Sequence, residues 1–405
     1  MKKKLAIISS YHELCGISTY TEALEKEFSK YFDVKVFSLD LDLLNSNNKK
    51  VRTLGDKHIK DIADRLSDYD YVNIQFEAGL YGMYPSEIYK RMKILINSSK
   101  NLIVTLHSVY VPVSFFDKNV LKRVSATGII KNLKLIYRQS IYPRLYKKLI
   151  SYLKKGSKRK NINIMVHNIK DKEVINLIYD FKNVEAFPLT YLTKEEKMYY
   201  EKNVKRTKFN KEWNLKDDDI VIGLFGFISQ YKGYDTAIKA LTLLPSRYKV
   251  LICGSQHPMS VKSYEKIDPY IKSLIELINK NNAILENRIL WAGSLEHEQF
   301  VETLHCCDYV VLPYMEVNQS GSGIATLTIE TKSKALLSNS KTFSKLKAFY
   351  PNCFKSFDIG NYRELAFKIE NFNDDYSSNI EKYLEIYNIE NNILTYKKLF
   401  EKKVR

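Results

Sequence analysis

The sequence predicts an α/β protein with two facing domains, each built on a doubly wound, Rossmann-like parallel sheet. Short apolar runs alternate with longer segments of helical periodicity along the whole chain, which is typical of parallel sheets flanked by helices. The runs form two series, separated by a polar and charge-rich stretch. With 405 residues and a hydrophobic content of 45%, the chain is long enough to bury two separate cores.

The elements follow from these runs in chain order. We expect strands of the first domain at residues 5–9, 34–38, 71–75, 102–106, 162–166 and 184–187. Strands of the second domain are expected at 220–225, 250–253, 289–291, 309–312 and 335–338. The predicted domains are 1–195 and 219–378, with a linker at 196–218 and C-terminal helices at 379–405 that could pack back on the first domain. Ligands of such sheets bind beyond the carboxyl ends of the strands, which places the expected site in the cleft between the domains.

Composition excludes several classes of protein. No stretch of about 18 apolar residues occurs, so no membrane-spanning helix is predicted. The chain starts with a basic and then apolar segment, as a signal peptide does, but the apolar run ends at Ile8 and polar residues follow it. We interpret it as the first strand. The five cysteines show no Cys-x-x-Cys spacing, which indicates reduced thiols of a cytoplasmic protein, without disulfides or a zinc site.

The net charge of +18 is concentrated in one segment. Residues 118–170 contain fifteen Lys and Arg and no acidic residue. Within this segment Tyr142, Leu145, Tyr146, Leu149 and Leu153 fall at helical spacing on one face, which is typical of a basic amphipathic helix lying on an anionic membrane. A solvated basic face and a nucleic-acid patch are the alternatives. We favour attachment at the inner face of the plasma membrane and expect no nucleic-acid partner.

The most informative stretch is residues 309–330. An apolar run is followed by Pro313, a polar loop with Gly321 and Gly323, and then a helical pattern from about Ile324. Ser322 is a good N-cap for that helix. Unpaired N–H groups and the helix dipole make such a helix N-terminus an anion site. Glu330 lies about 12 Å further along the helix, a plausible spacing between a diphosphate and a sugar hydroxyl of one nucleotide.

Three further residues stand just past predicted strand ends. Gly16 begins a helix after the first strand, although no Gly-x-Gly-x-x-Gly fingerprint is present there. His107 follows the fourth strand, a position that faces the site in such a sheet. Lys232 lies between the first strand of the second domain and the next helix, where it could neutralise a phosphate.

The chain resembles the family 4 retaining glycosyltransferases of the GT-B fold. The resemblance rests on the Phe-Ile-x-x-x-Lys-Gly block after 220–225, on 250–254, 288–293 and 308–314, and on Gln-Ser-Gly at 319–321. Residues 71–77 and the Thr-Leu-His strand end match less strongly. The resemblance implies that the C-terminal domain binds a sugar nucleotide and the N-terminal domain an acceptor.

The resemblance also implies roles for individual residues. Lys232 would contact the donor diphosphate, His107 the donor sugar and Glu330 the ribose hydroxyls. The remaining donor-binding residues would be Gly16, Gln319, Ser320, Gly321, Ser322, Gly323 and, beside the base, Leu295. Phe227 stands where the family usually has an Arg, Ser322 where it has the first Glu of a Glu-x7-Glu pair, and Cys15 where it has a Gly.

These observations predict a cytoplasmic retaining hexosyltransferase. It would move a sugar from a nucleotide diphosphate donor to a glycan or lipid-linked acceptor, in bacterial-type surface polysaccharide or glycoconjugate synthesis. No Asp-x-Asp stands at a strand end, so we expect no metal and no cofactor. The alternatives are a nucleotide-sugar epimerase of the same fold, which would need a pair of carboxylates, and a non-catalytic glycan-binding or scaffold protein.

Overall fold

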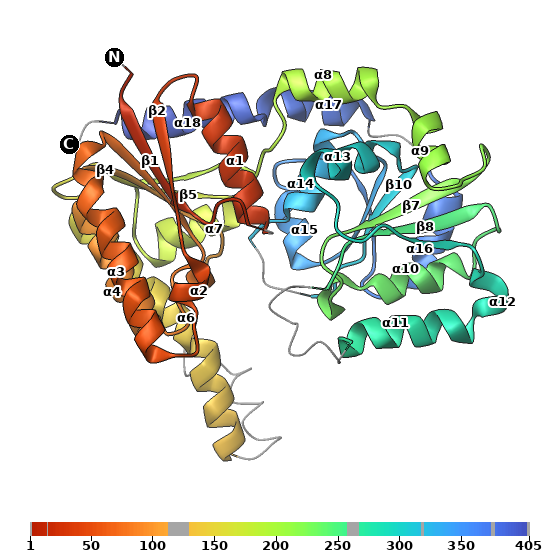
Figure 1. Ribbon diagram of the computed structural model, residues 1–405, viewed down its shortest axis with the longest axis horizontal. Helices are drawn as coiled ribbons and strands as arrows, with labels where there is room; N and C mark the ends of the chain where they lie inside the picture. The colour runs from red at the N-terminus through yellow and green to blue at the C-terminus, as the bar shows by residue number, and fades with distance from the viewer. Residues whose placement is uncertain are drawn as a thin grey trace. The chain divides into compact units, whose positions relative to one another are not determined.

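The computed structural model describes residues 2–13, 15–111, 129–256, 267–316, 320–373 and 377–402, except for the side chains of 129–140 and 377–378. The chain divides into two compact units. Unit 1 consists of 1–187 and 390–405, and unit 2 of 188–389. Each unit is a parallel sheet covered by helices, as Figure 1 shows. The predicted α/β class with two doubly wound parallel sheets is therefore confirmed.

The sheet of unit 1 has the strand order β2-β1-β3-β4-β5-β6. Its strands are β1 (Lys4–Ser9), β2 (Asp33–Ser38), β3 (Tyr71–Phe76), β4 (Asn101–Leu106), β5 (Ile162–Val166) and β6 (Val184–Ala186). The order reverses between β1 and β3, so their carboxyl ends form a topological switch point, where such sheets bind ligands. The helices that flank it are α1 (Gly16–Phe28), α2 (Leu41–Leu44), α3 (Lys49–Arg65), α4 (Pro85–Ser98), α6 (Ile129–Gly156) and α7 (Ile169–Glu173).

The sheet of unit 2 has the order β12-β11-β10-β7-β8-β9. Its strands are β7 (Ile220–Phe225), β8 (Tyr248–Cys253), β9 (Ile289–Trp291), β10 (Tyr309–Leu312), β11 (Ala335–Ser338) and β12 (Lys355–Phe357). Here the switch point lies between β7 and β10. The edge strand β12 was not predicted, because three residues, Lys-Ser-Phe, carry no apolar run.

The helices of unit 2 surround this sheet. They are α8 (Lys194–Asn203), α9 (Arg206–Glu212), α10 (Tyr234–Leu241), α11 (Pro269–Lys280), α12 (Asn282–Leu285), α13 (His297–Cys306), α14 (Gly323–Glu330), α15 (Lys341–Leu346), α16 (Tyr362–Glu370) and α17 (Ser377–Ile386). The stretch expected to be a linker thus holds α8 and α9. Helix α8 starts with a capping box between Thr193 and Glu196, which satisfies two backbone N–H groups at once.

The last helix, α18 (Ile389–Phe400), packs on the sheet of unit 1 almost from its first residue. Its Asn392 donates a hydrogen bond to the Tyr20 hydroxyl at 2.9 Å, and its Tyr396 hydroxyl lies 2.8 Å from Thr105 Oγ1. The ring of Phe400 packs on Tyr71. One face of the first sheet is therefore covered by a segment from the far end of the chain.

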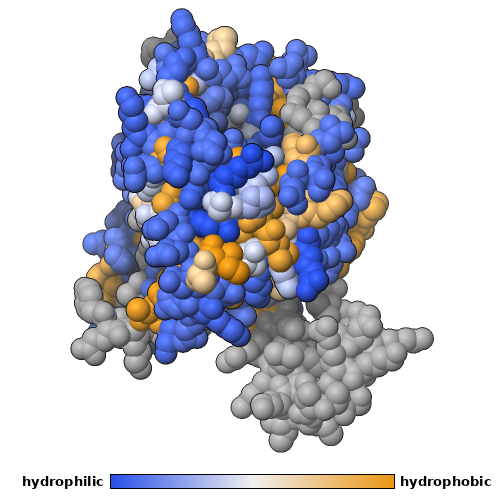
Figure 2. Space-filling view, turned by 90° about the vertical axis from the view of Figure 1, so that its right-hand side faces the viewer, coloured by the Kyte–Doolittle hydropathy of each residue, from blue (hydrophilic) through white to orange (hydrophobic). Residues whose placement is uncertain are grey.

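No helix in the described part of the chain is long and apolar enough to span a bilayer. The face shown in Figure 2 is mostly hydrophilic, with hydrophobic residues in small groups among the charged ones.

Candidate functional site

The loops after β7 and β10 meet at the switch point of unit 2. Gly233 has φ 66°, and a Cβ at this position would lie 2.0 Å from the carbonyl oxygen of Pro313. Gly226 has φ 99°, and a Cβ there would lie 2.6 Å from Cδ1 of Ile324. Only glycine tolerates both the left-handed backbone and the close approach. The two loops are thus in direct contact, and the first turn of α14 lies beside the loop after β7.

Lys232 lies buried between these loops, with 7% of its surface exposed. Its Nζ is 4.0 Å from the ring centroid of Tyr314 and 5.2 Å from that of Tyr231, and it donates a hydrogen bond to the Tyr314 hydroxyl. Burial lowers the pKa of Lys232, because a charge is less stable away from water. An ammonium held mainly by aromatic rings and a neutral hydroxyl is well placed to receive an anion.

Helix α14 presents its N-terminus to the same place. Ser322 is its N-cap, as expected, and Ser322 Oγ accepts a hydrogen bond from the N–H of Ala325 at 3.3 Å. The Tyr314 hydroxyl lies 3.3 Å from Ser322 Oγ. Lys232, Tyr314 and Ser322 therefore form one connected group at a helix N-terminus, an arrangement suited to a phosphate. The pKa of Tyr314 is raised by burial, so its hydroxyl keeps its proton.

Glu330 is at the other end of α14, and its carboxylate is already occupied. It accepts hydrogen bonds from the N–H groups of Tyr191 at 3.1 Å and Leu192 at 3.4 Å, and Lys197 Nζ lies 3.8 Å away. Burial raises the pKa of Glu330 to about 7, against the opposing effect of Lys197. Its role as a ribose ligand stays a prediction, which requires these bonds to be exchanged for ribose hydroxyls.

The segment that binds Glu330 also reaches the other end of α14. A Cβ on Gly323 would lie 2.4 Å from the Tyr191 hydroxyl. The Tyr191 side chain therefore extends from Glu330 to the first residue of the helix. Sequence reasoning missed Tyr191 and Tyr314, because a single tyrosine in a loop gives no periodic or motif signal.

The other predicted donor residues of unit 2 occupy varied positions. Ser320 is buried, and Gly321 precedes the N-cap of α14. Leu295 is half-buried in the loop after β9, two residues beyond Gly293, which has φ 70°. Gln319 lies outside the described residues. The proposed contacts of all four with a nucleotide stay predictions.

In unit 1, Gly16 is the first residue of α1, at the carboxyl end of β1. The N-cap is Cys15, whose Sγ accepts from the N–H of Ser18 at 3.4 Å. A Cβ on Gly16 would meet no atom within 4 Å. A side chain at this position would therefore meet open space among the described residues, and the expected contact of Gly16 with a diphosphate stays a prediction.

His107 follows β4 at the same edge of the sheet. Its backbone N–H donates to the carbonyl of Phe76, and its Nε2 lies 2.8 Å from Oε1 of Gln75. Its ring is 4.8 Å from the ring of His167, between centroids, and the edge of Tyr20 approaches both imidazoles. Burial, and next the neighbouring His167, keep the pKa of His107 well below its usual value. The imidazole is neutral and lies at the carboxyl edge of the sheet.

A half-buried carboxylate bonded to the residue after His107 was also missed. Glu77 directly follows β3, and its side chain accepts a hydrogen bond from Ser108 Oγ at 2.6 Å and from the N–H of Ala78 at 3.2 Å. Burial raises the pKa of Glu77, against the effect of these bonds. The polar interruption of β3 by Asn73 and Gln75, just before Glu77, was the available signal.

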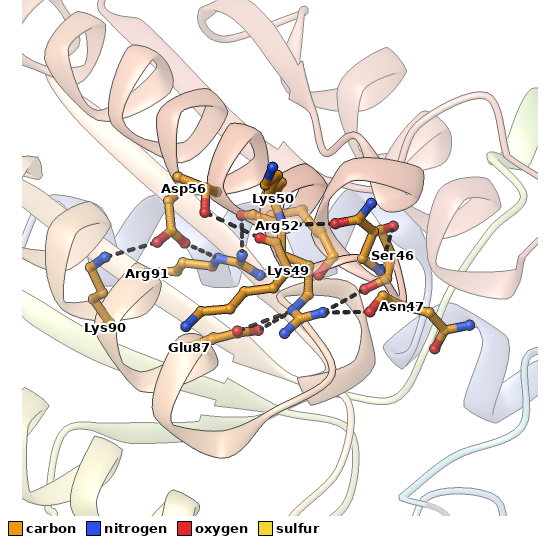
Figure 3. Close-up of polar contacts among 12 residues, drawn as sticks. Ser46, Asn47, Lys49, Lys50, Arg52, Asp56, Glu87, Lys90 and Arg91 are labelled. Carbon is orange, nitrogen blue, oxygen red and sulfur yellow. Dashed lines mark hydrogen bonds and ion pairs between the residues drawn. The ribbon is translucent and has the colours of Figure 1, made fainter.

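Two arginines fix the loops that follow β2 and β3 (Figure 3). Arg91 is 1% exposed and binds Asp56 at 2.7 Å, together with the carbonyls of Leu44, Tyr81 and Arg52. The guanidinium of Arg52 binds Glu87 and the carbonyls of Ser46 and Asn47. Both arginines satisfy carbonyls of loops at the carboxyl edge of the sheet, so they shape the surface where the resemblance places an acceptor.

Most of the apolar stripe predicted on the basic helix packs in the core of unit 1. Leu145, Tyr146, Leu149 and Leu153 are at most 3% exposed, and belong to the core of unit 1. Tyr142, the first residue of the predicted stripe, is 38% exposed, and Lys147, Lys148 and Lys155 on the polar face are exposed as well. Four of the five stripe residues are therefore used by the core and not by a membrane. Residues 112–128 and the side chains of 129–140 lie outside the described part of the chain, and membrane attachment stays a prediction.

No group of three or more His, Cys, Asp or Glu is placed to hold a metal ion within the described residues. The five cysteines are free thiols, four of them buried.

Comparison with known proteins supports the reading of unit 2. Residues 205–327 match the family model of glycosyl transferases group 1. This range includes the loops of Lys232 and Ser322 and ends before Glu330. No curated protein matches the chain significantly in sequence.

Solved structures resemble the chain over its whole length. The crystal structure of Anabaena HepE in complex with UDP has a TM-score of 0.63 at 12% identity, covering 98% of this chain and 99% of that one. A UDP-forming α,α-trehalose-phosphate synthase from Burkholderia xenovorans has a TM-score of 0.64 at 11% identity, covering 99% of both chains. WaaG, a glycosyltransferase involved in lipopolysaccharide biosynthesis, has 0.61 at 11%, covering 98% and 100%. At these identities the likeness shows the fold, which is that of GT-B glycosyltransferases.

Proposed function

We propose that this protein is a retaining glycosyltransferase that takes a sugar from a nucleoside diphosphate and transfers it to a glycan or lipid-linked acceptor. The observation that carries the proposal is the group of Lys232, Tyr314 and Ser322 at the N-terminus of α14. The group 1 glycosyltransferase match over 205–327 supports it. UDP is the first donor base to test, because HepE and the trehalose-phosphate synthase are described with UDP.

The chemistry of this site would be assisted departure of the diphosphate. Lys232 offers a positive charge, and Tyr314 and Ser322 offer hydroxyl hydrogen bonds, while the first turn of α14 offers backbone N–H groups. Such donors stabilise the charge that develops on the leaving group. The aromatic contacts hold Lys232 in place before the ligand arrives, which reduces the reorganisation needed during reaction. Phe227 stands where the resemblance implies an arginine, and the Tyr314 hydroxyl would supply part of the missing hydrogen bonding.

The role of unit 1 would be to hold the acceptor and to contact the transferred sugar through His107. Glycan assembly at the inner face of the plasma membrane is the setting that we propose, with the exposed lysines of α6 attracted to anionic lipid. Because the apolar face of α6 is in the core, this attachment would be electrostatic and reversible.

Nucleotide binding tests the proposal first. UDP, GDP and ADP are added at millimolar concentration, and the melting temperature is followed, since a ligand that binds the native state stabilises it. UDP should raise the melting temperature of the native protein. Lys232→Met should weaken UDP binding by about 1.5–3 kcal/mol, the value of a charge-assisted hydrogen bond.

The matched control is Lys239→Met. Lys239 is on the next helix, α10, and pairs with Asp235 in a half-exposed i,i+4 contact, so UDP affinity should stay within about 0.5 kcal/mol. Equal losses in both variants, or no response to any nucleotide, would contradict the proposal. With UDP-sugars, acceptor-dependent release of UDP indicates transfer, conversion of the sugar nucleotide alone indicates epimerisation, and binding without turnover indicates a non-catalytic protein.

A further inference from the structure

A chain of buried polar side chains leads through the sheet of unit 1 to His107. Asn73 and Gln75 on β3 and Thr105 on β4 are fully buried, although strands in such sheets are usually apolar. Asn73 Nδ2 lies 3.1 Å from the carbonyl oxygen of Ile103 and 3.0 Å from Thr105 Oγ1. Gln75 Nε2 lies 2.5 Å from Asn73 Oδ1, and Gln75 Oε1 lies 2.8 Å from His107 Nε2.

The direction of every bond in this chain follows from one fixed group. The backbone carbonyl of Ile103 can only accept, so the amide group of Asn73 that faces it must be the NH₂ group. Asn73 Oδ1 therefore faces Gln75, which must present its own NH₂ group in return. This orientation leaves Gln75 Oε1 directed at His107. The orientations of both amides therefore follow from the carbonyl of Ile103, which can only accept a hydrogen bond.

The same logic fixes the proton of His107. Gln75 Oε1 is an acceptor, so His107 Nε2 must be the protonated ring nitrogen. In a neutral imidazole the other nitrogen, Nδ1, then carries a lone pair and can only accept. Nδ1 of His107 has no hydrogen-bond partner among the described residues, and the side chain is half-buried at the edge of the sheet.

The neighbouring imidazole favours this neutral state. His167 Nδ1 lies 3.3 Å from the carbonyl of Phe187, so Nδ1 is protonated and its Nε2 is the acceptor. Burial lowers the pKa of His167 to about 4, so it is neutral as well. Two neutral rings, whose centroids are 4.8 Å apart and which both contact the edge of Tyr20, offer no charge that would attract a phosphate or a carboxylate.

We propose that Asn73 and Gln75 are positioning residues that hold His107 in its Nε2–H tautomer, so that His107 Nδ1 accepts a hydrogen bond from a hydroxyl of a sugar. The inference rests on the proposed function only for the identity of the ligand as a sugar. It adds that this part of the site recognises a hydroxyl donor and rejects anions. An anionic group has no proton to donate, so its lone pairs would repel the lone pair of Nδ1.

The tautomer is measured directly, in the free protein, by long-range ¹⁵N–¹H correlation spectra of histidine-labelled protein, with His107→Gln for assignment. His107 should show a protonated Nε2 and a bare Nδ1. A protonated Nδ1 would overturn the proposal. This result does not depend on activity, so it stands apart from any failure of the glycosyltransferase proposal.

Two variants test the positioning role. Gln75→Met keeps the approximate volume but removes the acceptor, so His107 should become a mixture of both tautomers. Thr105→Val is the matched control. It also removes a buried polar group of this network, but the Ile103 carbonyl still orients Asn73. The control should keep the native tautomer. If Gln75→Met leaves the His107 spectrum unchanged, or Thr105→Val alters it equally, the positioning role is wrong.

Donor analogues supply the functional measurement. With a sugar nucleotide that the native protein uses, a set of deoxy-sugar analogues identifies the hydroxyl that is read. With the native protein and with Thr105→Val, the analogue that lacks this hydroxyl should have a kcat/KM about tenfold lower than the full sugar nucleotide. This is the effect of one hydrogen bond. Gln75→Met should lose most of this discrimination. Equal discrimination in all three proteins would contradict the proposed reading of a hydroxyl through His107.

Discussion

The two sheets of this protein prepare their sites by different means. In unit 1, buried amides and hydroxyls cross the sheet below the site, and one of them orients a histidine. In unit 2, the loops at the site approach so closely that a Cβ on Gly233 or Gly254 would collide with a backbone carbonyl oxygen. Unit 1 therefore positions side chains, and unit 2 positions backbone.

This difference matches the ligands that each unit is proposed to bind. A diphosphate is bound well by backbone N–H groups and a helix N-terminus, which need close approach and no side-chain specificity. A sugar offers hydroxyls that both donate and accept, so its recognition needs groups whose protons are fixed. The comparison predicts that added side-chain atoms destabilise the loops of unit 2, whereas lost polar contacts destabilise unit 1.

The largest effect is expected from Gly254→Ala in unit 2. A Cβ at this position would lie 1.9 Å from the carbonyl oxygen of Gly226, and backbone cannot yield as a side chain can. We expect the free energy of unfolding to fall by about 3 kcal/mol, as measured by urea denaturation. The matched control in unit 1 is Gly16→Ala, where the new methyl group meets open space and the change should stay within about 0.5 kcal/mol. Equal losses at both positions would remove the contrast between the units.

An effect of similar size is expected for Arg91, one of the two arginines that fix the loops of unit 1. Arg91→Met removes the partner of Asp56 and of three backbone carbonyls. Because buried polar groups are left without partners, we expect a loss of about 3 kcal/mol in unfolding free energy. Lys90→Met is the control, since Lys90 binds the same carboxylate but is largely exposed, and it should cost less than about 1 kcal/mol. A similar loss in both variants would show that Asp56 alone accounts for the effect.

Glu330 provides a prediction of pH dependence in unit 2. Its pKa is raised by burial from 4.5 to about 7, so the folded protein holds this proton more tightly than the unfolded chain. The stabilisation is complete below pH 4.5 and is lost as the pH rises through about 7. Between pH 5 and 8 this loss should reach about 2 kcal/mol.

The measurement is chemical denaturation at several pH values. Glu330→Gln should flatten the pH dependence, because glutamine does not titrate. If the variant keeps the native pH profile, Glu330 is not the responsible group. If the same variant also weakens UDP binding, the predicted ribose contact gains support.

The smallest effect is expected for membrane attachment through unit 1. Lys148 is exposed on α6, whereas Lys154 is paired with Asp180 at 2.5 Å. Lys148→Ala should weaken binding to anionic vesicles by about 1 kcal/mol, or about fivefold, and Lys154→Ala by less. Co-sedimentation at low and high salt measures this. Equal binding to neutral vesicles, or no binding at low salt, would leave a solvated basic face as the explanation.

The sequence predicted the sheets well because strands buried on both faces read as apolar runs with few alternatives. Eleven strands were placed close to their observed bounds, and within the described ranges the short edge strand β12 alone was missed. The N-cap role of Ser322 was also predictable, because capping depends on local chemistry alone. Elements set by neighbours in sequence were therefore recognised from the chain.

What failed depended on which partner a residue meets in space. The apolar stripe of α6 was assigned to a membrane, although a protein core requires the same helical spacing. The position of Glu330 at the end of α14 was counted correctly, but its backbone partners Tyr191 and Leu192 could not be foreseen from that count. The chain of buried polar side chains from Asn73 to His107 could not be predicted. Its hydrogen bonds connect residues about thirty positions apart on two strands, and no sequence spacing indicates them.

The packing of α18 on the first sheet affects the order in which the two units fold during translation. The bond between Thr105 and Tyr396 joins residues 291 positions apart, so the face of the sheet at Thr105 remains uncovered until α18 has been synthesised, after all of unit 2. Unit 2 is continuous in sequence and can fold while translation is still in progress. At 5–20 residues per second, about 200 residues take roughly 10–40 s to add. The sheet of unit 1 is thus synthesised before unit 2 and covered after it.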